Sequence, residues 1–387
     1  MKRYKKIIFL SLSDARHIST WSGIPYFMQH EFKKRYVVES IYLGPYASYI
    51  DLIIRAVLKM VSFLLCGKYD SSHSLVRAWY HGIYFSKKLK KYEQEESVVL
   101  LPAGSSILCY LKTNLPTLYV SDTTFKNMIN YYPNFSGLNR LSIKEGNYLE
   151  KRAIHKSTYN MYPSEWAAKS AIDDYRADPQ KVFVIPFGAN IHERIPSVTE
   201  KADISKECHL LFLGVNWERK GGRIAYETFN ILKEKNYPVS LRICGCVPPF
   251  RIIDDEQVKV ISYLNKKDKN EYARFREILK QTHWLILPTQ AECYGIVFCE
   301  ASAYSIPSIT FDTGGVSSIV YDKINGRLLK TGADAEAFAE IIQYYIQHPD
   351  EYKILSQKSY ALYAERLNWE TWVNKVEQIL YKGDITV

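Results

Sequence analysis

The fold of this chain is constrained most by a repeated alternation between short apolar runs and longer amphipathic stretches. In the first half the apolar runs predict β-strands at 6–11, 39–43, 97–101, 117–120, 157–161 and 181–185. In the second half they predict strands at 209–213, 239–244, 258–263, 284–287 and 308–311, with helices at 223–236, 271–280 and 334–348. Apolar strands joined by crossover helices indicate parallel sheets that are covered on both faces.

The alternation is interrupted once, by the polar and poorly periodic stretch 193–206, and then restarts. A chain of 387 residues is too long for one ordinary domain and suits two. We therefore predict an α/β protein with domains at 1–195 and 196–367. In open parallel sheets of this kind, ligands bind beyond the carboxyl ends of the strands, so the chemistry is expected in the loops that follow strands.

Charge is distributed unevenly between the two halves. The chain has 51 basic and 41 acidic side chains, and residues 1–200 hold 27 of the basic and 17 of the acidic ones. The second half is therefore neutral, which a uniform polybasic nucleic-acid binder would not be. A hydrophobic content of 47% also excludes a mainly disordered chain.

Cysteine usage and the apolar segments point to a cytoplasmic protein. The seven cysteines are odd in number and lack zinc-finger spacing, which favours reduced thiols. The four apolar residues after Lys6 are too few for a signal peptide and predict a first buried strand. The longest apolar segment is broken by Arg55 and Lys59, so we predict no membrane span.

The loop after the strand 209–213 has the composition of an anion site. It contains Gly214, the adjacent cations Arg219 and Lys220, and two further glycines before a predicted helix. Glycines let the backbone approach a ligand, while the cations and the helix N-terminus attract negative charge. A solvated basic turn is the alternative for this segment by itself.

Two glutamates lie in the segment 288–303, which follows the strand 284–287. Glu292 is expected on a loop, and Glu300 just past the first turn of a helix that opens near Gly295. Carboxylates at such a place accept hydrogen bonds from a polyhydroxyl ligand while helix N–H groups hold a phosphate. The alternatives are an acid/base pair for glycoside hydrolysis, and ordinary capping or surface carboxylates.

Glu292 and Glu300, with seven residues between them, resemble the E-x7-E signature of family-4 glycosyltransferases. Several other segments are similar to the same family, most strongly between residues 119 and 329: 163–168, 185–190, 217–222, Gly314-Gly315 and Asn325-Gly326. The resemblance implies the GT-B architecture, with two Rossmann-like α/β domains whose parallel sheets face a central cleft. It also implies that a C-terminal helix at about 368–387 packs back on the first domain, which would bind the acceptor.

The resemblance assigns roles in donor binding to residues of the second half. Glu292 would contact donor-sugar hydroxyls, Glu300 the ribose, and Arg219 with Lys220 the diphosphate, since Val215 stands where many relatives carry an arginine. Further donor contacts would come from Gly214, from the backbone of Tyr294, Gly295, Ile296 and Val297, and, around the base, from Cys244, Gly245, Tyr263 and Leu264.

In the first half the resemblance points to two strand ends. Ser22 and Gly23 stand where the family has a glycine-rich loop that closes over the donor phosphate. Asp122 stands where many relatives place a histidine close to the donor sugar, and it is our fourth catalytic candidate beside Glu292, Arg219 and Lys220. Asp14, Arg16 and His17 also follow the first strand, with acceptor binding and a plain surface role both open.

The activity that the resemblance implies is retaining transfer of a sugar from a nucleotide-diphosphate donor, a UDP- or GDP-sugar, to a glycan or lipid-linked acceptor in cell-surface polysaccharide synthesis. No metal and no cofactor is expected, because the cations and a helix N-terminus can stabilise the departing diphosphate. The alternatives are a non-catalytic nucleotide-sugar-binding partner subunit and a nucleotide-sugar epimerase on the same fold.

The surplus of positive charge lies in the predicted acceptor half, which suggests an anionic or membrane-bound acceptor rather than nucleic acid. A basic and aromatic stretch carries much of it, with Arg55, Lys59, Lys68, Lys87, Lys88, Lys90 and Lys91 beside Trp79, Tyr80, Tyr84 and Phe85. Such a face would make a peripheral contact with the anionic inner surface of the cell membrane. A solvated basic face over a buried helix is the alternative.

Overall fold

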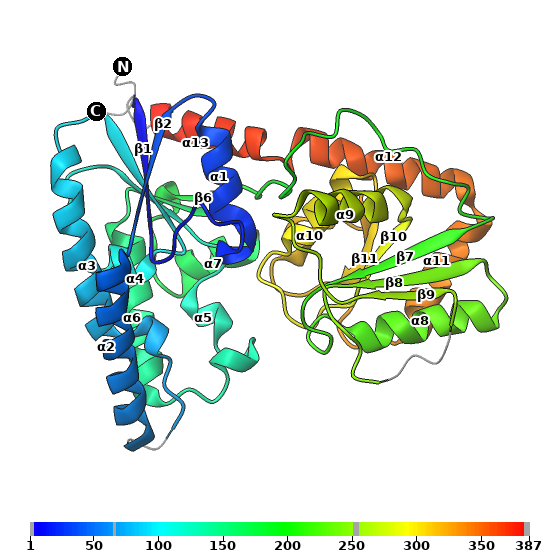
Figure 1. Cartoon of the computed structure of the whole chain (residues 1–387), viewed down its shortest axis with the longest axis horizontal. Coiled ribbons are helices and arrows are strands. Elements are labelled where there is room, and N and C mark those ends of the chain that lie inside the picture. The colour runs from blue at the N-terminus through cyan, green and yellow to red at the C-terminus, as the bar shows by residue number, and fades with distance from the viewer. Residues whose placement is uncertain (1–3, 65–66, 251–254, 383–387) are drawn as a thin grey trace. The chain divides into compact units, whose positions relative to one another are not determined.

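The computed structural model of the chain describes residues 4–64, 67–250 and 255–382. The chain forms two compact units, each built around its own parallel sheet (Figure 1). The first unit comprises Met1–Ile185 together with Val373–Val387, and the second comprises Pro186–Trp372.

The first unit contains a six-stranded parallel sheet with the order β2-β1-β3-β4-β5-β6. Its strands are β1 (Lys6–Ser11), β2 (Val37–Tyr42), β3 (Ser97–Pro102), β4 (Thr117–Val120), β5 (Tyr159–Tyr162) and β6 (Val182–Val184). From β1 the chain proceeds to β2 on one side of the sheet, and from β3 it proceeds to β4 on the other side. The loops that follow β1 and β3 therefore diverge to opposite faces of the sheet.

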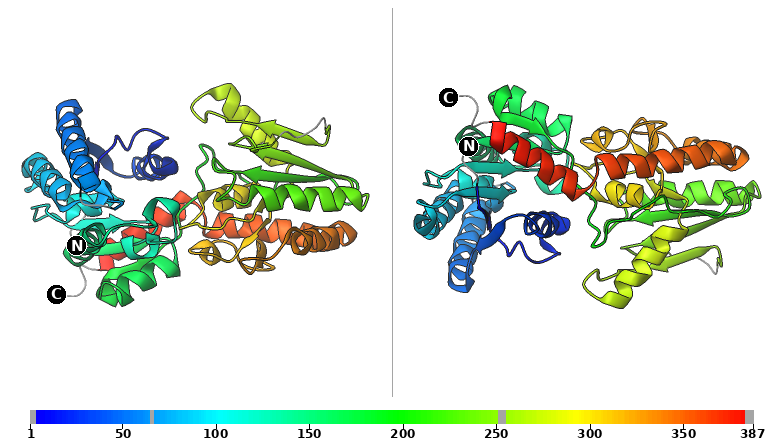
Figure 2. Two further views of the ribbon diagram at one scale, coloured as in Figure 1. Left: turned by 90° about the horizontal axis from the view of Figure 1, so that it is seen from below. Right: turned by 90° about the horizontal axis from the view of Figure 1, so that it is seen from above.

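Helices cover both faces of this sheet (Figures 1 and 2). They are α1 (Ile24–Phe32), α2 (Pro45–Leu64), α3 (Leu75–Leu89), α4 (Ser105–Leu108), α5 (Phe125–Met128), α6 (Arg140–Lys156), α7 (Glu165–Asp173) and the later part of α13 (Trp369–Lys382). Side chains alternate between the faces along each strand, so Phe9 packs on Phe32 of α1 while Ile8 joins the cluster that includes Phe85 of α3. Glu377 of α13 accepts hydrogen bonds from Arg35 at 2.7 Å and Tyr36 at 2.8 Å, just after α1.

The second unit repeats this architecture with the strand order β12-β11-β10-β7-β8-β9, again all parallel. Its strands are β7 (Cys208–Leu213), β8 (Val239–Cys244), β9 (Val258–Ile261), β10 (Trp284–Leu287), β11 (Ser308–Phe311) and β12 (Gly326–Leu329). Its helices are α8 (Gly222–Glu234), α9 (Lys269–Gln281), α10 (Ile296–Ala303), α11 (Ala335–Gln347) and α12 (Pro349–Glu365). β10 is buried at every position, as the continuous apolar run predicted.

The predicted α/β fold with two Rossmann-like units is confirmed, and β1, β4, β8, β10 and β11 have the predicted bounds. One strand, β12, was not predicted, because only Leu328 and Leu329 are apolar in it. The strand predicted at 157–161 begins two residues later, at Tyr159. Ser157 instead ends α6, where its hydroxyl donates to the Ile154 carbonyl at 2.9 Å.

The boundary between the units lies at Ile185, earlier than the predicted residue 195. Phe187 explains the shift, since it packs between Tyr294 and Trp369, both in the second unit. At the other end, the chain re-enters the first unit at Val373, inside α13, rather than at residue 368. The last residues of the segment predicted at 368–387 lie outside the described part of the chain.

In the described ranges 4–64, 67–250 and 255–382, no helix combines the length and the apolar character needed to cross a bilayer.

Candidate functional site

The candidate site of the second unit lies at the point where its strand order reverses. β7 and β10 are neighbours in the sheet, and the chain proceeds from β7 outward to β8 and from β10 outward to β11. The loops after β7 and β10 therefore leave adjacent strand ends on the same edge. Open parallel sheets bind their ligands at such a place.

Hydrogen bonds hold the loop after β7 against the loop after β10. The amide N–H of Gln290 donates to the Arg219 carbonyl at 2.8 Å, and the Arg219 guanidinium donates to the Ala291 carbonyl at 2.6 Å. Within its own loop, the Arg219 amide donates to the Asn216 side chain at 2.8 Å. Arg219 is thus held in position at both its backbone and its side chain.

Glu292 meets both cations of the first loop. Its carboxylate accepts a short hydrogen bond from Lys220 Nζ, and Oε2 lies 3.5 Å from Arg219 Nη1. The side chains of Lys220 and Glu292 are only 9% and 13% exposed. Two cations and one carboxylate, largely removed from water, leave a net positive site with strong local electrostatics.

Two left-handed glycines make this arrangement sterically feasible. Gly221 (φ 75°) ends the first loop, and a Cβ there would lie 2.0 Å from the Pro288 carbonyl oxygen of the second loop. Gly295 (φ 92°) caps α10, where a Cβ would lie 2.7 Å from the Phe298 ring. The Phe298 amide donates to the Gly295 carbonyl at 3.0 Å, and the N-terminus of a helix such as α10 is a place where backbone N–H groups can bind an anion.

Glu300 lies on α10 and is buried, and Lys266 pairs with it at 2.7 Å. Lys266 is also held over the Phe275 ring at 4.4 Å. Sequence reasoning missed this lysine, although it directly follows the turn 263–265 that was expected beside the nucleobase. A cation next to a predicted ligand carboxylate was the signal that could have identified it.

The residues predicted around the base lie at the ends of β8 and β9. Gly214 and Gly245 approach each other closely, since a Cβ on Gly245 would lie 2.9 Å from the Gly214 carbonyl oxygen. Burial raises the pKa of the Cys244 thiol to about 11, so the thiol stays neutral. Leu264 is buried, whereas Tyr263 is 65% exposed.

Side chains and backbone play different parts in the segment 294–297. The Tyr294 ring is buried, and its hydroxyl donates to the Phe187 carbonyl at 2.9 Å. The Tyr294 ring is therefore engaged inside the unit, whereas Ile296 and Val297 are half-buried. Val215, which stands where an arginine was expected, is 73% exposed and carries no charge.

The first-unit candidates are joined by a hydrogen bond across two loops. Trp21 and Ser22 adopt left-handed backbone conformations (φ 42° and 56°), followed by Gly23 (φ 84°) at the start of α1. The Trp21 indole N–H donates to Asp122 Oδ2 at 3.3 Å, just after β4. Ser22 and Gly23 are therefore part of a strained turn that Trp21 fastens to Asp122.

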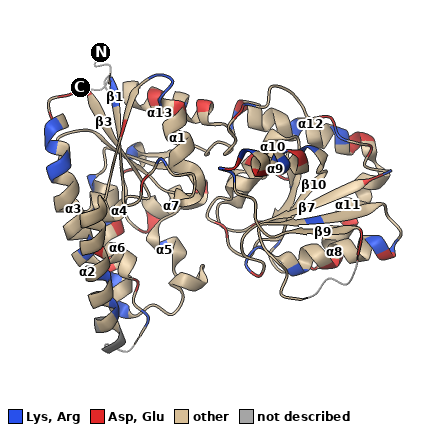
Figure 3. Ribbon diagram, in the orientation of Figure 1, with Lys and Arg blue, Asp and Glu red and all other residues tan. Residues whose placement is uncertain are grey.

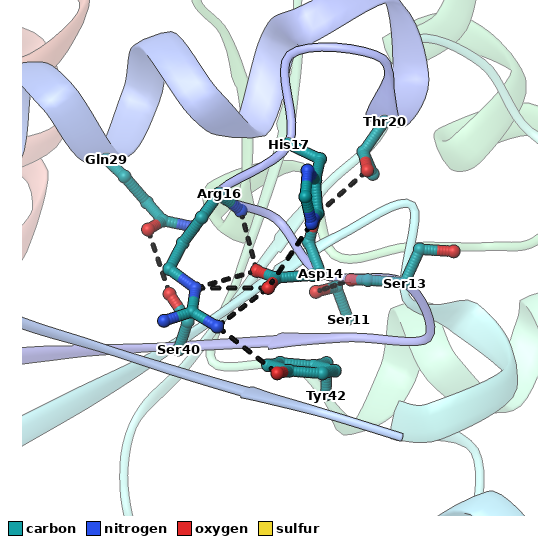
Figure 4. A network of polar contacts seen from close by, with 9 residues as sticks. All are labelled: Ser11, Ser13, Asp14, Arg16, His17, Thr20, Gln29, Ser40 and Tyr42. Atoms are coloured by element: carbon teal, nitrogen blue, oxygen red, sulfur yellow. Dashed lines mark hydrogen bonds and ion pairs between the residues drawn. The ribbon is translucent and has the colours of Figure 1, made fainter. Parts of the chain in front are cut away.

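Asp14, Arg16 and His17 form a network within the loop after β1, shown in Figure 4. The Arg16 guanidinium donates to both oxygens of Asp14 at 2.7–3.1 Å and lies 5.4 Å from the Tyr42 ring centroid. His17 Nε2 lies 3.8 Å from Asp14, and the Thr20 hydroxyl donates to the Asp14 carbonyl at 2.9 Å. The charges of this network largely satisfy one another, which favours a role in shaping the loop.

Within the residues that the structure describes, no group of three or more His, Cys, Asp or Glu side chains is arranged to hold a metal ion. Independence from metal remains a prediction.

Residues 197–362 match the family model described as "Glycosyl transferases group 1". The match contains Arg219, Lys220, Lys266, Glu292 and Glu300, and it lies within the second unit.

Curated relatives are distant and overlap this chain in part. A D-inositol 3-phosphate glycosyltransferase from Arthrobacter sp. (strain FB24) is 21% identical over 57% of this chain and 55% of its own length. A probable sucrose-phosphate synthase from Thermosipho melanesiensis is 22% identical over 60% of this chain and 55% of its own length. The chain thus spans about half the length of the curated relatives that it matches.

Solved structures match over nearly the whole chain. The sucrose-phosphate synthase of Thermosynechococcus elongatus aligns with a TM-score of 0.68 at 15% identity, covering 99% of this chain and 100% of that one. Anabaena HepE in complex with UDP and glucose aligns with a TM-score of 0.64 at 14% identity, covering 98% and 100%. At such identities the likeness shows the fold, which is GT-B. The family match adds that residues 197–362, within the second unit, resemble a group 1 glycosyl transferase domain.

Proposed function

We propose that this chain is a retaining, metal-independent glycosyltransferase that moves a sugar from a nucleotide-diphosphate donor to a glycan or lipid-linked acceptor. The observation that carries the proposal is the cluster of Arg219, Lys220 and Glu292 at the β7/β10 switch point. HepE, which shares the fold, is described in complex with UDP-glucose, and this supports a UDP-sugar as donor here.

The cluster suits a ligand that carries both a diphosphate and hydroxyl groups. Arg219 and Lys220 are close enough together to bind one diphosphate, and the α10 N-terminus supplies further N–H donors. Glu292 neutralises these cations when no diphosphate does. On donor binding the phosphates pair with the cations instead, and the Glu292 carboxylate accepts hydrogen bonds from the sugar hydroxyls.

This exchange also accounts for catalysis. Negative charge builds up on the diphosphate as the glycosidic bond breaks, and fixed cations in a site with little water stabilise that charge strongly. Retention follows if the acceptor attacks the face from which the diphosphate leaves and gives its proton to the departing phosphate. The protein then needs no nucleophile of its own, and Asp122 has a supporting part at most.

On the donor side, Glu300 and Lys266 would hold the ribose and its neighbouring phosphate, and Cys244, Gly245, Tyr263 and Leu264 the base. On the acceptor side, the surplus charge of the first half favours an anionic or membrane-bound acceptor. This fits polysaccharide assembly at the inner face of the cell membrane, in the cytoplasm.

A donor screen tests the proposal. UDP- and GDP-sugars are offered to the purified chain, and thermal shift reports binding while release of UDP or GDP reports turnover. We expect one nucleotide class to stabilise the chain and its sugar to be slowly hydrolysed without acceptor, in the presence of EDTA. Turnover that depends on added Mg²⁺ or Mn²⁺ would contradict metal independence.

Glu292→Ala distinguishes chemistry from binding. Transfer and hydrolysis should be lost, while UDP or GDP still binds at least as tightly as to the parent chain, because the variant no longer competes for Lys220. Glu277→Ala, on the exposed side of α9, serves as the matched control and should leave both unchanged. Binding without turnover in the parent chain would favour the non-catalytic subunit, and conversion of the donor sugar to its epimer without any acceptor would favour the epimerase.

A further inference from the structure

Two helices of the first unit, α2 and α3, lie side by side along its flank (Figures 1 and 2). The Tyr80 hydroxyl donates to the Ala47 carbonyl at 3.1 Å, and Asp51 pairs with Arg77 at 2.7 Å and with His81 at 2.9 Å. Later residues of α2 thus meet earlier residues of α3, so the helices run antiparallel. Ala78, Phe85 and Leu89, about a quarter of a turn around α3 from these contacts, are buried in the interior of the unit.

Large apolar side chains form an exposed row on each of these helices. The row on α2 consists of Tyr46, Tyr49, Ile53, Val57 and Met60, and that on α3 of Val76, Trp79 and Ile83; these eight side chains are 37–78% exposed. Within each row the spacing is three or four residues, which aligns side chains along one side of a helix. Since Ala47 and Asp51 of α2 face α3, helical spacing places both rows on the side of the pair that points away from the interior of the unit.

The row on α3 continues at the same spacing into two lysines. Lys87 and Lys90 follow Ile83 by four and seven positions, and both are exposed. Together with Lys112 they line a hollow of about 450 Å³, which Ile83 also borders. Figure 3 shows the concentration of basic residues at this end of α3.

The acidic side chains near this surface form ion pairs or hydrogen bonds within the unit. The segments of α2 and α3 contain one acidic residue, Asp51, which Arg77 and His81 hold between the helices. In the hollow, Glu93 accepts hydrogen bonds from the Thr113 hydroxyl at 2.7 Å and the Asn114 amide at 3.0 Å. The exposed surface therefore combines apolar side chains with lysines and suits a partner that is apolar and negatively charged.

We propose that these two rows and the three lysines form one docking surface for an anionic phospholipid bilayer. The apolar rows enter the interface, with Tyr and Trp at the headgroup level, while Lys87, Lys90 and Lys112 meet lipid phosphates. The surface deepens the proposed function, because it would place the acceptor half of the chain at a lipid-linked acceptor. Its test needs no transfer reaction, so the two proposals can fail separately.

This surface differs from the basic face that the sequence suggested. Phe85 is buried, and Lys68 donates to the Pro133 and Ser136 carbonyls at 2.7 and 3.1 Å. Arg55 and Lys59 lie on the far side of α2 from the row, as their spacing from Ile53 and Met60 shows. The apolar row of α2, whose later residues belong to the longest apolar segment of the sequence, takes their place.

Vesicle co-sedimentation of the full chain tests the proposal, with vesicles of phosphatidylcholine alone and with an equal part of phosphatidylglycerol. We expect binding to the anionic vesicles only, and weaker binding as salt is raised. Lys87→Glu with Lys90→Glu and Lys112→Glu should lower partitioning by at least about 100-fold, since each of the three cations contributes roughly fivefold near an anionic surface and its reversal adds repulsion. Lys33→Glu with Lys169→Glu and Lys181→Glu makes the same charge change elsewhere on this unit and should lower it by less than about tenfold.

The apolar rows are tested by Ile53→Ser with Trp79→Ser, against Ile324→Ser with Ile354→Ser as a control of equal number on exposed sites of the second unit. The first pair should lower partitioning by at least about tenfold, because two large apolar side chains no longer enter the lipid interface. All variants should unfold at the temperature of the parent chain. The salt response of the parent chain is a readout that does not depend on how any variant folds.

Several results would overturn the proposal. One is that the parent chain binds no vesicles, or binds neutral and anionic vesicles equally well. Another is that the control variants lose as much binding as the test variants, or that inorganic phosphate binds in the hollow as tightly as anionic vesicles do. Sedimentation velocity gives a further result that would overturn it. If the parent chain is a dimer and Ile53→Ser with Trp79→Ser converts it to monomers, this face is an interface between two copies of the chain.

Discussion

Each unit has a loop that leaves the first strand of its sheet and ends at a left-handed glycine before a helix, but the two loops use charge differently. In the second unit, Arg219 and Lys220 reach across to Glu292 on another loop. In the first unit, Arg16 pairs with Asp14 two residues away. A pair between loops can be opened by a ligand that replaces one partner, whereas a pair within a loop fixes the loop's own shape.

The largest expected effect follows from this contrast. Arg219→Ala with Lys220→Ala should weaken binding of UDP or GDP, whichever the chain prefers, by about 10²- to 10⁴-fold, because two charge-assisted contacts to phosphate are lost. Arg16→Ala should change the same affinity by less than about threefold, since this guanidinium is engaged within its own loop. Titration calorimetry of both variants measures the difference.

Arg223→Ala with Lys269→Ala is the charge-matched control, because both side chains are exposed in the same unit. If this control weakens nucleotide binding as much as the clamp variant, the effect is one of net charge. If Arg16→Ala matches the clamp variant, the comparison between the loops is wrong.

The second effect concerns how closely the loops approach. Gly221→Ala should destabilise the chain by about 4 kcal/mol, because it adds both left-handed strain and a Cβ that overlaps the Pro288 carbonyl. At Gly332 (φ 93°), where an added Cβ meets nothing within 4 Å, alanine carries the strain alone and should cost about 1–2 kcal/mol. Denaturant unfolding measures both, and equal costs would show that the contact with Pro288 contributes nothing.

The location of these loops was predictable, but the contacts between them were not. Fully buried parallel strands are mostly apolar, so β4 and β10 could be predicted with their bounds. The positions of the loops that follow these two strands were then fixed as well. Short and partly polar β12 gives no such signal. The pairing of Lys266 with Glu300 joins residues 34 positions apart, and it depends on how β9 and β10 are ordered in the sheet.

The same limit explains the boundary between the units. Phe187 belongs to a segment that sequence reasoning assigned to the first domain, and nothing local distinguishes it from its neighbours. Its assignment is decided by two aromatic partners, Tyr294 and Trp369, more than 100 residues away. Packing of that kind becomes visible only once the fold is known.

A third effect contrasts the pH dependence of the units. Burial raises the pKa of Glu150 on α6 to about 7, and the Tyr119 hydroxyl donates to it at 2.9 Å. As the pH rises from about 4.5 to about 7, the unfolded chain releases this proton while the folded chain keeps it. The first unit should therefore lose about 3 kcal/mol of stability over that range.

The second unit should respond in the opposite direction. Burial lowers the pKa of His283 to about 4, and the neutral ring donates from Nε2 to the Ala202 carbonyl while Nδ1 accepts from the His209 amide, both at 3.0 Å. As the pH falls from about 6.5 to about 4, only the unfolded chain takes up this proton, which costs about 3 kcal/mol of stability.

Hydrogen exchange of the full chain, corrected for intrinsic rates, separates the two responses. Protection of β3 and β4 should fall as the pH rises, and that of β7 and β10 should fall as it drops. Glu150→Gln should remove the first dependence and leave the second. A parallel pH dependence of both sheets in the parent chain would contradict this assignment.

The smallest effect concerns the turn that Trp21 fastens to Asp122. Trp21→Phe keeps an aromatic ring but removes the indole N–H, which should cost about 1 kcal/mol of stability. Asp122→Asn keeps an oxygen acceptor for that N–H and should cost less, so the two variants separate loss of the hydrogen bond from loss of the charge. Denaturant unfolding measures both costs.

The rate of transfer then assigns the role of Asp122. If its carboxylate acts only by holding the turn, Trp21→Phe should lower kcat as much as Asp122→Asn or more. If the carboxylate acts on the substrate, Asp122→Asn should lower kcat further, despite its smaller effect on stability. The first outcome would make this loop, like the Asp14–Arg16 network beside it, a device for shaping the backbone, and would leave the chemistry to the ion pairs of the second unit.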